Sequence, residues 1–215
     1  MPQDPFSGLA DDERTAVLAR MRPRSYAAGT LVFLEGQAGD GLHVMTSGHV
    51  MVRRSTDDGD LVSLTVLGAG DSFGELALLA PHARRTADVV ALDEVTTLVL
   101  MRKDLDLLRA RYPRLDRGLL LVLVTQVERL SEQVLQALHT PVEQRVVQTL
   151  LRLAGLYASG DGPVTIPIRQ EDIASMAGTS RPTVNRLARR LEVEGVLRLG
   201  RGRTVVLDRD RLARS

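Results

Sequence analysis

The chain has 215 residues, of which 44% are hydrophobic and 3% aromatic, and it contains no cysteine. This length and apolar content suit one or two domains with a hydrophobic core and argue against a disordered chain. The lack of cysteine excludes disulfides, thiolate zinc sites, a cysteine nucleophile and cysteine-ligated iron–sulfur clusters. The longest apolar run, residues 119–124, is far shorter than the roughly 20 residues that span a bilayer. The first residues do not resemble a signal peptide, and we therefore expect a soluble, cytoplasmic protein without membrane contact.

Charge is distributed unevenly along the chain. Residues 1–140 carry 19 acidic and 15 basic side chains, whereas residues 141–215 carry 8 acidic and 13 basic ones. Seven arginines lie between Arg181 and Arg203. A basic C-terminal third on a mildly acidic body indicates a polyanionic partner for that end. The alternative is that these arginines only solvate a helix face.

The first block of predicted elements is rich in β-strands. A short helix over residues 11–21 precedes residues 27–101, where nine glycines separate short β-rich runs. Many short strands with close turn signals predict a sandwich or jelly roll that forms a β-barrel. Asp57-Asp58-Gly59 predicts a hairpin turn, because glycine tolerates a positive φ. The β-rich runs are residues 30–34, 42–45, 50–52, 61–66 and 95–100.

Helical periodicity replaces the strand pattern from Met101 to His139, with an interruption at Pro113. Apolar residues there follow the 3-4-3-4-3 spacing of a helix that packs on a second helix. Further apolar residues at 119, 121 and 122 offer a second surface toward the barrel. We predict that the seam forms a homodimer, the alternative being a seam buried against the barrel. The seam consists of Leu120, Leu123, Val127, Leu130, Val134 and Ala137.

The third block predicts a winged helix-turn-helix. A turn with a glycine separates two predicted helices, and two β-rich runs around Gly200–Arg203 follow them as a hairpin. This order of helix, turn, helix and hairpin is typical of a DNA-binding module. The helices are predicted over residues 142–157, 169–177 and 181–194, with the turn at Gly178.

The helix over residues 181–194 has the composition of a recognition helix. We expect the Ser180 side chain to cap it by accepting hydrogen bonds from its first amides. One face is apolar, and the other carries arginines and an amide that suit guanine, adenine and phosphate in a major groove. Arg201 and Arg203 in the wing are expected to contact phosphate. The apolar face is Val184, Leu187, Ala188 and Leu191, and the opposite face holds Arg181, Pro182, Asn185, Arg186 and Arg189.

A second motif lies in the β-rich block: Phe73-Gly-Glu-Leu-Ala-Leu-Leu, followed by Arg84-Arg-Thr-Ala. Gly74 lets the backbone approach a ligand, and a short helix over residues 75–79 is expected to offer its first amides to a phosphate. An arginine then supplies a permanently charged clamp for that phosphate, and Thr86 adds a hydroxyl donor. Glu75 repels a phosphate, so we expect it to accept from a sugar hydroxyl.

Both motifs resemble those of a known family. The motif at 73–79 with 84–87 resembles the phosphate-binding cassette of cyclic nucleotide-binding domains, and residues 179–186 resemble the recognition helix of CRP/FNR-type transcription regulators. The resemblance covers nearly the whole chain and implies an α+β fold. Its parts are a β jelly-roll cyclic nucleotide-binding domain (1–114), a dimerisation helix (115–139) and a winged helix-turn-helix DNA-binding domain (140–215).

The resemblance also implies roles for single residues. Gly74, Glu75 and Leu76 lie in the cassette, with Glu75 on the ribose hydroxyl, while Arg85 and Thr86 hold the cyclic phosphate. The family's adenine contacts fall on Leu130 and Ser131, of which only Ser131 keeps the hydroxyl. Pro182 replaces a family glutamate, so the preference at that base pair should relax or change. The implied DNA-binding residues are Thr179, Ser180, Arg181, Pro182, Thr183, Asn185, Arg186, Arg189, Arg201 and Arg203.

We therefore predict a homodimeric bacterial transcription regulator, not an enzyme, that binds palindromic double-stranded DNA. A cyclic nucleotide, with cAMP as the first choice, modulates its operator affinity. We expect no metal and no iron–sulfur cluster; four histidines leave haem formally available, but they lack metal-ligand spacing. RNA polymerase stays open as a further partner. One alternative is a family member that binds DNA without an effector. The other is an enzyme or a structural β-roll protein, and the sequence contains neither the nucleophile elbow nor the P-loop that would indicate an enzyme.

Overall fold

The structure is a computed structural model, and it describes residues 6, 9–39, 41–76, 84–113 and 115–215. In the helix over residues 115–139 it describes the side chains of only some residues. The chain forms two compact units. The β unit comprises residues 1–55 and 65–130, and the C-terminal unit comprises residues 56–64 and 131–215.

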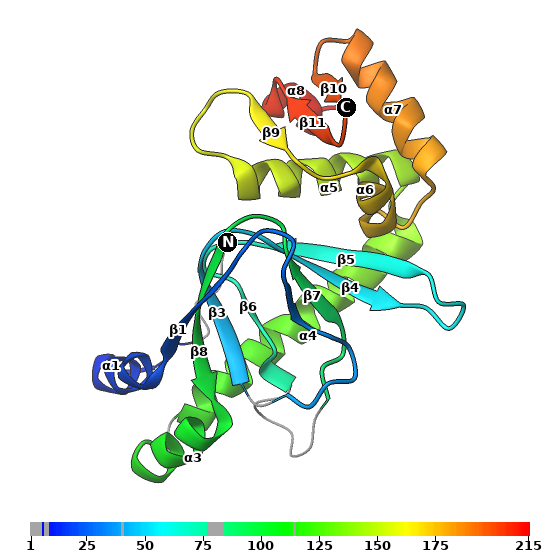
Figure 1. The fold of residues 1–215 in the computed structure, drawn as a ribbon. Helices are drawn as coiled ribbons and strands as arrows, with labels where there is room; N and C mark the ends of the chain where they lie inside the picture. The colour runs from blue at the N-terminus through cyan, green and yellow to red at the C-terminus, as the bar shows by residue number, and fades with distance from the viewer. Residues whose placement is uncertain (1–5, 7–8, 40, 77–83, 114) are drawn as a thin grey trace. The chain divides into compact units, whose positions relative to one another are not determined.

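Two four-stranded sheets build the β unit (Figure 1). Their strand orders are β1-β8-β3-β6 and β2-β7-β4-β5, so each strand is followed by one in the other sheet, except that β5 follows β4 in the same sheet. Strand β8 pairs antiparallel with β1 and β3, and β7 pairs antiparallel with β2 and β4. This arrangement confirms the predicted β domain. The strands are β1 Arg22–Tyr26, β2 Leu31–Phe33, β3 Gly41–Ser47, β4 Val50–Ser55, β5 Leu61–Leu67, β6 Ser72–Phe73, β7 Asp88–Ala91 and β8 Val95–Met101.

The core of the β unit lies between the two sheets. Its buried cluster combines side chains of one sheet, such as Met45 and Phe73, with side chains of the other, such as Val50 and Val89. A second cluster joins the sheet of β3 and β8 to helices α1 (Asp11–Arg20) and α3 (Arg102–Arg111). Its members include Val17, Leu42, Leu100, Leu105 and Leu108.

Strands β1, β6 and β7 are missing from the sequence prediction. The first four residues of β1 are exposed, and Pro23 lies among them, so this strand shows neither apolar alternation nor β-branched residues. Strand β6 is only two residues long. The predicted turn before β5 is present, because Gly59 has φ +85° and its amide donates to the Thr56 carbonyl at 2.9 Å.

Helix α4 (Leu115–His139) is 25 residues long and begins after the predicted interruption at Pro113. Four residues of the predicted seam, Leu120, Val127, Leu130 and Val134, are at least half exposed. The side chains of the predicted second surface, at 119, 121 and 122, lie outside the described ones, as does that of Ala137 in the seam.

The C-terminal unit is the predicted winged helix-turn-helix. Helix α5 spans the predicted residues and buries Val146, Leu150, Leu153 and Ala154. Helices α6 and α7 pack on each other around a turn at Gly178, which has φ +59°. A three-stranded sheet of order β10-β11-β9 forms the wing; the predicted hairpin corresponds to β10 and β11, whereas β9 is missing from the sequence prediction. The elements are α5 Val142–Tyr157, β9 Val164–Ile166, α6 Gln170–Met176, α7 Arg181–Val193, β10 Leu197–Gly200, β11 Arg203–Val206 and α8 Arg209–Ala213.

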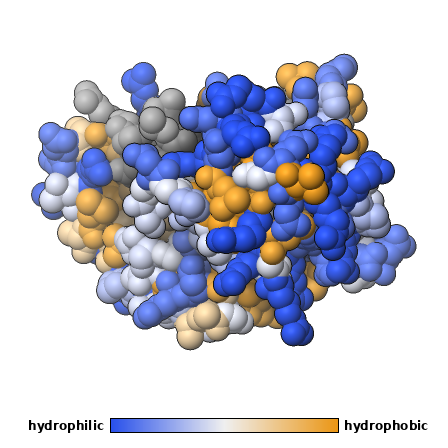
Figure 2. Space-filling view, turned by 90° about the horizontal axis from the view of Figure 1, so that it is seen from above, coloured by the Kyte–Doolittle hydropathy of each residue, from blue (hydrophilic) through white to orange (hydrophobic). Residues whose placement is uncertain are grey.

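The surface seen in Figure 2 is largely hydrophilic, with hydrophobic residues in separate patches. Among the described residues, none of the helices combines the length and apolar character needed to cross a membrane.

Candidate functional sites

Arg85 is a buried arginine of the β unit, with only 7% of its surface exposed. Its Nη1 donates to the carbonyl of Gly41 at 3.0 Å and to the carbonyl of Gly74 at 3.3 Å. The guanidinium carbon lies 4.1 Å from the centre of the Phe33 ring, within the range of a cation–π contact. These contacts fix the orientation of the guanidinium beside Gly74.

Gly74 follows strand β6 directly and has φ +84°. This left-handed conformation favours glycine, because a side chain would meet its own backbone. A Cβ atom at this position would also collide with Nη1 of Arg85. The backbone of Gly74 and the charge of Arg85 therefore lie together only because residue 74 has no side chain.

The remaining cassette residues are more exposed than Arg85. Glu75 is half-buried and Leu76 is exposed, and both have helical conformation. Residues 77–79 of the predicted short helix lie outside the described residues. Thr86 is exposed. Arg84 is also exposed and donates to the Gly36 carbonyl at 2.7 Å, so two consecutive arginines have opposite environments.

An aromatic cluster beneath Arg85 was missed by sequence reasoning. The His43 imidazole stacks on Phe73 at 4.9 Å between ring centres and meets Phe33 edge-on at 6.0 Å. Burial, together with the nearby charges of Arg85 and Arg24, lowers the pKa of His43 to about 3. The imidazole is therefore neutral at pH 7. These rings come from β2, β3 and β6, which only the closed sheets bring together.

Leu130 and Ser131 lie on α4, and both are exposed. Leu130 belongs to the predicted apolar seam and is 50% exposed. A leucine side chain has no hydrogen-bonding atom, whereas Ser131 carries a hydroxyl that can donate or accept.

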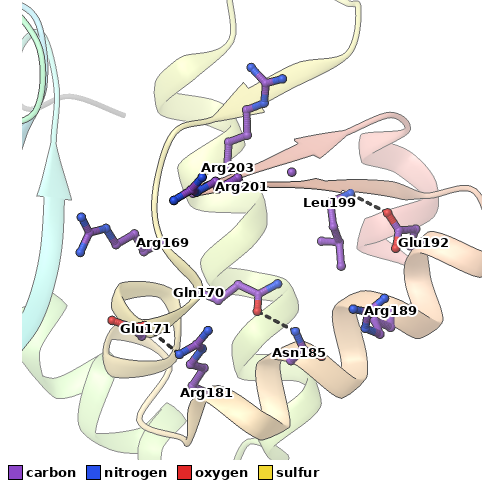
Figure 3. A pocket seen from close by; sticks show the side chains of 12 residues that line it. Arg169, Gln170, Glu171, Arg181, Asn185, Arg189, Glu192, Leu199, Arg201 and Arg203 are labelled. Atoms are coloured by element: carbon purple, nitrogen blue, oxygen red, sulfur yellow. Dashed lines mark hydrogen bonds and ion pairs between the residues drawn. The ribbon is translucent and has the colours of Figure 1, made fainter.

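A groove of about 790 Å³ lies between the start of α6, helix α7 and the wing (Figure 3). Helix α7 contributes Arg181, Asn185 and Arg189, which follow one another at intervals of one helical turn. The wing contributes Arg201 and Arg203 among others. Five arginines and two glutamates line the groove, so its potential favours a polyanion.

The start of α6 supplies groove residues that sequence reasoning did not single out. Arg169, Gln170 and Glu171 all line the groove. Asn185 Nδ2 donates to Gln170 Oε1 at 3.0 Å, and Arg181 Nη1 lies 3.0 Å from Glu171 Oε1. The apolar pattern of α6 gives no sign of these contacts, because they depend on how α6 packs against α7.

The other predicted DNA-binding residues lie around the N-terminus of α7 but do not line the groove: Thr179, Ser180, Pro182, Thr183 and Arg186. The predicted side-chain cap is wrong. Among the described residues, no amide of α7 donates to the Ser180 side chain, whose Oγ lies 3.0 Å from Thr183 Oγ1. The Ser180 carbonyl instead accepts from the amides of Thr183 and Val184.

Hydrogen bonds between side chains and the backbone hold the wing and the turn in place. Glu192 of α7 accepts a hydrogen bond from the amide of Leu199 at 2.7 Å, which joins the helix to β10. Arg145 of α5 donates to the carbonyls of Ala177 and Gly178 at 3.0 and 3.1 Å. These hydrogen bonds between side chains and backbone fix the positions of the wing and of the turn relative to α7 and α5.

Comparisons with known proteins agree with both halves of this description. The cyclic nucleotide-binding domain matches residues 23–112, and the Crp-like helix-turn-helix domain matches residues 144–215. The chain is 32% identical to the CRP-like cAMP-activated global transcriptional regulator of Mycobacterium tuberculosis, over 97% of this chain and 94% of that protein. It is 34% identical to the cyclic AMP receptor protein of Thermus thermophilus, over 92% and 89% of the two chains.

Among solved structures, the catabolite activator protein of Thermus thermophilus matches with a TM-score of 0.57 and 32% identity, over 98% of this chain and 96% of that one. A cyclic nucleotide-binding domain joined to a Crp-like helix-turn-helix defines a class of DNA-binding transcription regulators. The chain belongs to the CRP/FNR family of these regulators. The members of this family are transcription regulators and not enzymes, so the enzyme alternative is set aside.

Proposed function

We propose that this regulator acts in the cytoplasm as a homodimer whose affinity for operator DNA rises when a cyclic nucleotide, cAMP first, binds the β unit. The observation that carries the proposal is the position of Arg85, buried and held against the backbone of Gly74. A planar guanidinium in a fixed orientation suits two of the oxygens of one phosphate.

In this proposal the cassette residues have distinct roles. Arg85 pairs with the cyclic phosphate and Thr86 donates its hydroxyl to the same group. Gly74 allows the ligand to approach the backbone, because it adds no side chain beside the guanidinium. Glu75, a half-buried carboxylate next to Gly74, accepts from the ribose hydroxyl, and Leu76 supplies apolar contact at the exposed edge.

Cyclic AMP is the first choice of effector because the two relatives described above are a cAMP-activated regulator and a cyclic AMP receptor protein. In this proposal the adenine lies toward α4, where Ser131 offers the only hydroxyl of the pair Leu130 and Ser131. Since Leu130 cannot donate to the purine, we expect the discrimination between purines to be weaker than a pair of hydroxyls would give.

The homodimer is proposed from the apolar seam of α4. Leu120, Val127, Leu130 and Val134 are 59%, 62%, 50% and 57% exposed in the single chain, although all four are apolar. A stripe of this spacing is the interface of a two-helix coiled coil, and exposed apolar stripes mark surfaces that are covered by a partner. A second copy of this helix presents the same stripe, so the partner is the chain itself.

Palindromic DNA follows from a twofold dimer, because two copies of α7 read half-sites about one helical turn apart. Arg181, Asn185, Arg186 and Arg189 are proposed to face the bases and nearby phosphates. Thr179, Ser180 and Thr183 contact phosphate at the helix N-terminus, where Pro182 offers no hydrogen bond. Arg201 and Arg203 of the wing contact phosphate.

A second candidate function is DNA binding without an effector. It is favoured by Leu130, which extends the apolar seam at the position where the resemblance puts an adenine contact. A continuous seam stabilises one helix–helix geometry whether or not a ligand is present. Under this alternative, Leu130→Thr lowers the affinity of the ligand-free protein for operator DNA.

The test of the proposed function is calorimetric titration of the full-length protein with cAMP, with cGMP and adenosine as comparison ligands. Binding of cAMP with a stoichiometry of one per chain is expected, and adenosine should bind far more weakly because it lacks the phosphate. Sedimentation of the same samples gives the oligomeric state. Absence of cAMP binding by a folded dimer that still binds operator DNA would favour the effector-free alternative.

A further inference from the structure

We propose that Gln170 sets the base preference of Asn185: it holds the Asn185 amide in the orientation that reads an adenine. Gln170 would then be a positioning residue for sequence recognition, although it belongs to α6 and not to the recognition helix. This inference rests on the proposed reading of bases by α7.

The contact that carries the inference is the hydrogen bond from Asn185 Nδ2 to Gln170 Oε1, at 3.0 Å. Figure 3 shows the side chains of Gln170 and Asn185 pointing toward each other from α6 and α7, with a dashed line for their hydrogen bond. Both side chains are half-buried. The neighbouring pair of Arg181 and Glu171 differs, since those side chains are 65% and 59% exposed. An exposed ion pair contributes little to orientation, whereas a half-buried amide pair keeps its geometry.

The hydrogen-bonding capacity of asparagine explains why this contact matters. An amide has two N–H donors and one carbonyl acceptor. Gln170 accepts from one of the two donors of Asn185. The other donor and the carbonyl form the pattern that matches adenine, whose N7 accepts and whose N6 donates in the major groove. If Asn185 flipped while Gln170 kept its orientation, the Asn185 carbonyl would face the Gln170 carbonyl oxygen, and two acceptors repel.

Helix packing fixes the pair before DNA arrives. Ile173 and Ala174 of α6 and Val184 and Ala188 of α7 are all buried, and α6 packs against α7. Gln170 lies one turn before the buried residues of α6, and Asn185 follows Val184 directly. Because the free protein already orders both amides, less side-chain entropy is lost when a base binds.

The rival role for Gln170 is a direct contact to a DNA phosphate. A phosphate contact carries no sequence information, so its loss weakens binding to all sequences alike. A positioning role has a different signature, because its loss changes preference at one base pair and leaves the affinity for unrelated DNA unchanged. The two roles are therefore separated by a specificity ratio and not by affinity alone.

The experiment is selection of binding sites from random duplex DNA by the full-length protein, with and without cAMP, followed by affinity measurements on single-base variants. Asn185→Ala identifies the base pair that depends on Asn185. Gln170→Met removes the acceptor at similar volume, and Gln170→Glu keeps an acceptor for Asn185 Nδ2. Gln148→Met makes the same substitution at an exposed glutamine of α5 that does not line the groove, so it is the matched control. Thermal unfolding checks that each variant is folded.

At the Asn185-dependent position we expect the wild-type protein to prefer adenine by about 5- to 100-fold. Gln170→Met should remove most of this preference while changing the affinity for unrelated DNA by less than about twofold. Gln170→Glu should retain the preference, and Gln148→Met should leave it unchanged. In the Asn185→Ala background, Gln170→Met should have no further effect at this base pair, because the two residues act as one unit.

The proposal is overturned if Gln170→Met keeps the full preference, or if it weakens binding to all sequences equally. It is also overturned if Asn185→Ala changes no base preference while Arg181→Ala does. In that case the proposed reading of bases by α7 still holds, and only the role of Gln170 and Asn185 fails. If neither Asn185→Ala nor Arg181→Ala changes any preference, the proposed reading of bases by α7 fails together with this inference.

Discussion

The arginines of the two candidate sites differ in how exposed they are and in how firmly their side chains are held. In the β unit, Arg85 is 7% exposed, lies over an aromatic ring and donates to two backbone carbonyls. In the C-terminal unit, the side chain of Arg181 is 65% exposed and its partner Glu171 is 59% exposed. The first guanidinium has one orientation, whereas the second can move away from its carboxylate at low cost.

This difference corresponds to two kinds of anion. A small phosphodiester of fixed shape is recognised best by a rigid donor in a site that excludes water, because the hydrogen bonds there are stronger. Duplex DNA offers many phosphates along a deformable backbone, and its binding energy is spread over many exposed cations. The comparison therefore predicts that single substitutions have large effects in the β unit and small, additive effects in the wing.

Arg85→Gln should have the largest effect. We expect the affinity for cAMP to fall about 100-fold or more, because two charge-assisted hydrogen bonds to the phosphate are lost. Arg84→Gln is the matched control, since Arg84 is exposed and its guanidinium donates to the Gly36 carbonyl at 2.7 Å. Titration calorimetry of both variants measures the difference. Equal losses in both would contradict the assignment of the phosphate to Arg85.

The buried imidazole of His43 predicts a dependence of stability on pH. Its pKa is about 3 in the folded chain, and 6.5 is the usual value. Below pH 6.5 the unfolded state therefore binds a proton that the folded state does not, so stability is lost as the pH falls. The expected slope is about 1.4 kcal/mol per pH unit between pH 6.5 and 3.

His43→Gln removes this contribution. The free energy of unfolding of the wild-type protein, measured relative to that of the variant by urea denaturation, should decrease by about 2 kcal/mol from pH 7 to pH 5. Comparison with the variant cancels the titration of the carboxylates. Parallel pH profiles of the two proteins would show that His43 is not buried in its neutral form.

Comparison of Gly74→Ala with Gly59→Ala separates the effect of backbone strain on stability from the effect of a collision with Arg85 on ligand affinity. Both glycines have φ near +85°, but a Cβ at Gly59 has nothing within 4 Å, whereas one at Gly74 meets Arg85. Each variant should lose about 1–2 kcal/mol of stability through strain. Only Gly74→Ala should also lose cAMP affinity, by about tenfold or more, because it displaces the guanidinium. A normal affinity in Gly74→Ala would remove Gly74 from the ligand site.

The smallest effects are expected in the wing. Arg201→Gln and Arg203→Gln should each weaken DNA binding by a few-fold and reduce the slope of log affinity against log salt by about one unit. The loss should be the same for operator and unrelated duplexes, since phosphate contacts carry no sequence information. A change of base preference in either variant would place that arginine in a groove and not on the backbone.

Sequence patterns predicted the elements whose side chains alternate between core and solvent. Helix α5 was predicted with its observed bounds, because Val146, Leu150 and Leu153 repeat at helical spacing and are buried. Strand β1 was not predicted, since its exposed residues and Pro23 lack that alternation. Helix α7 ends at Val193, one residue before the predicted end, and Glu194 forms its C-cap.

The residues of the two sites could be predicted from the sequence only where they belong to a motif of residues close together in the chain. Gly74 and Arg85 belong to such a motif, and they are neighbours in the structure. The ring cluster of Phe33, His43 and Phe73 comes from three separate strands, so no spacing along the chain indicates it. The partner of Asn185 was missed for the same reason, since Gln170 lies on another helix.

The most direct test of the proposed switch is the affinity for a selected operator, measured at fixed salt with and without cAMP, in the wild-type protein and in Arg85→Gln. The account predicts that cAMP raises the wild-type affinity by about 5- to 150-fold, the usual range of allosteric coupling. Arg85→Gln should bind the operator with the same affinity in both conditions. Equal and specific binding by the wild-type protein with and without cAMP would contradict the account and establish DNA binding without an effector.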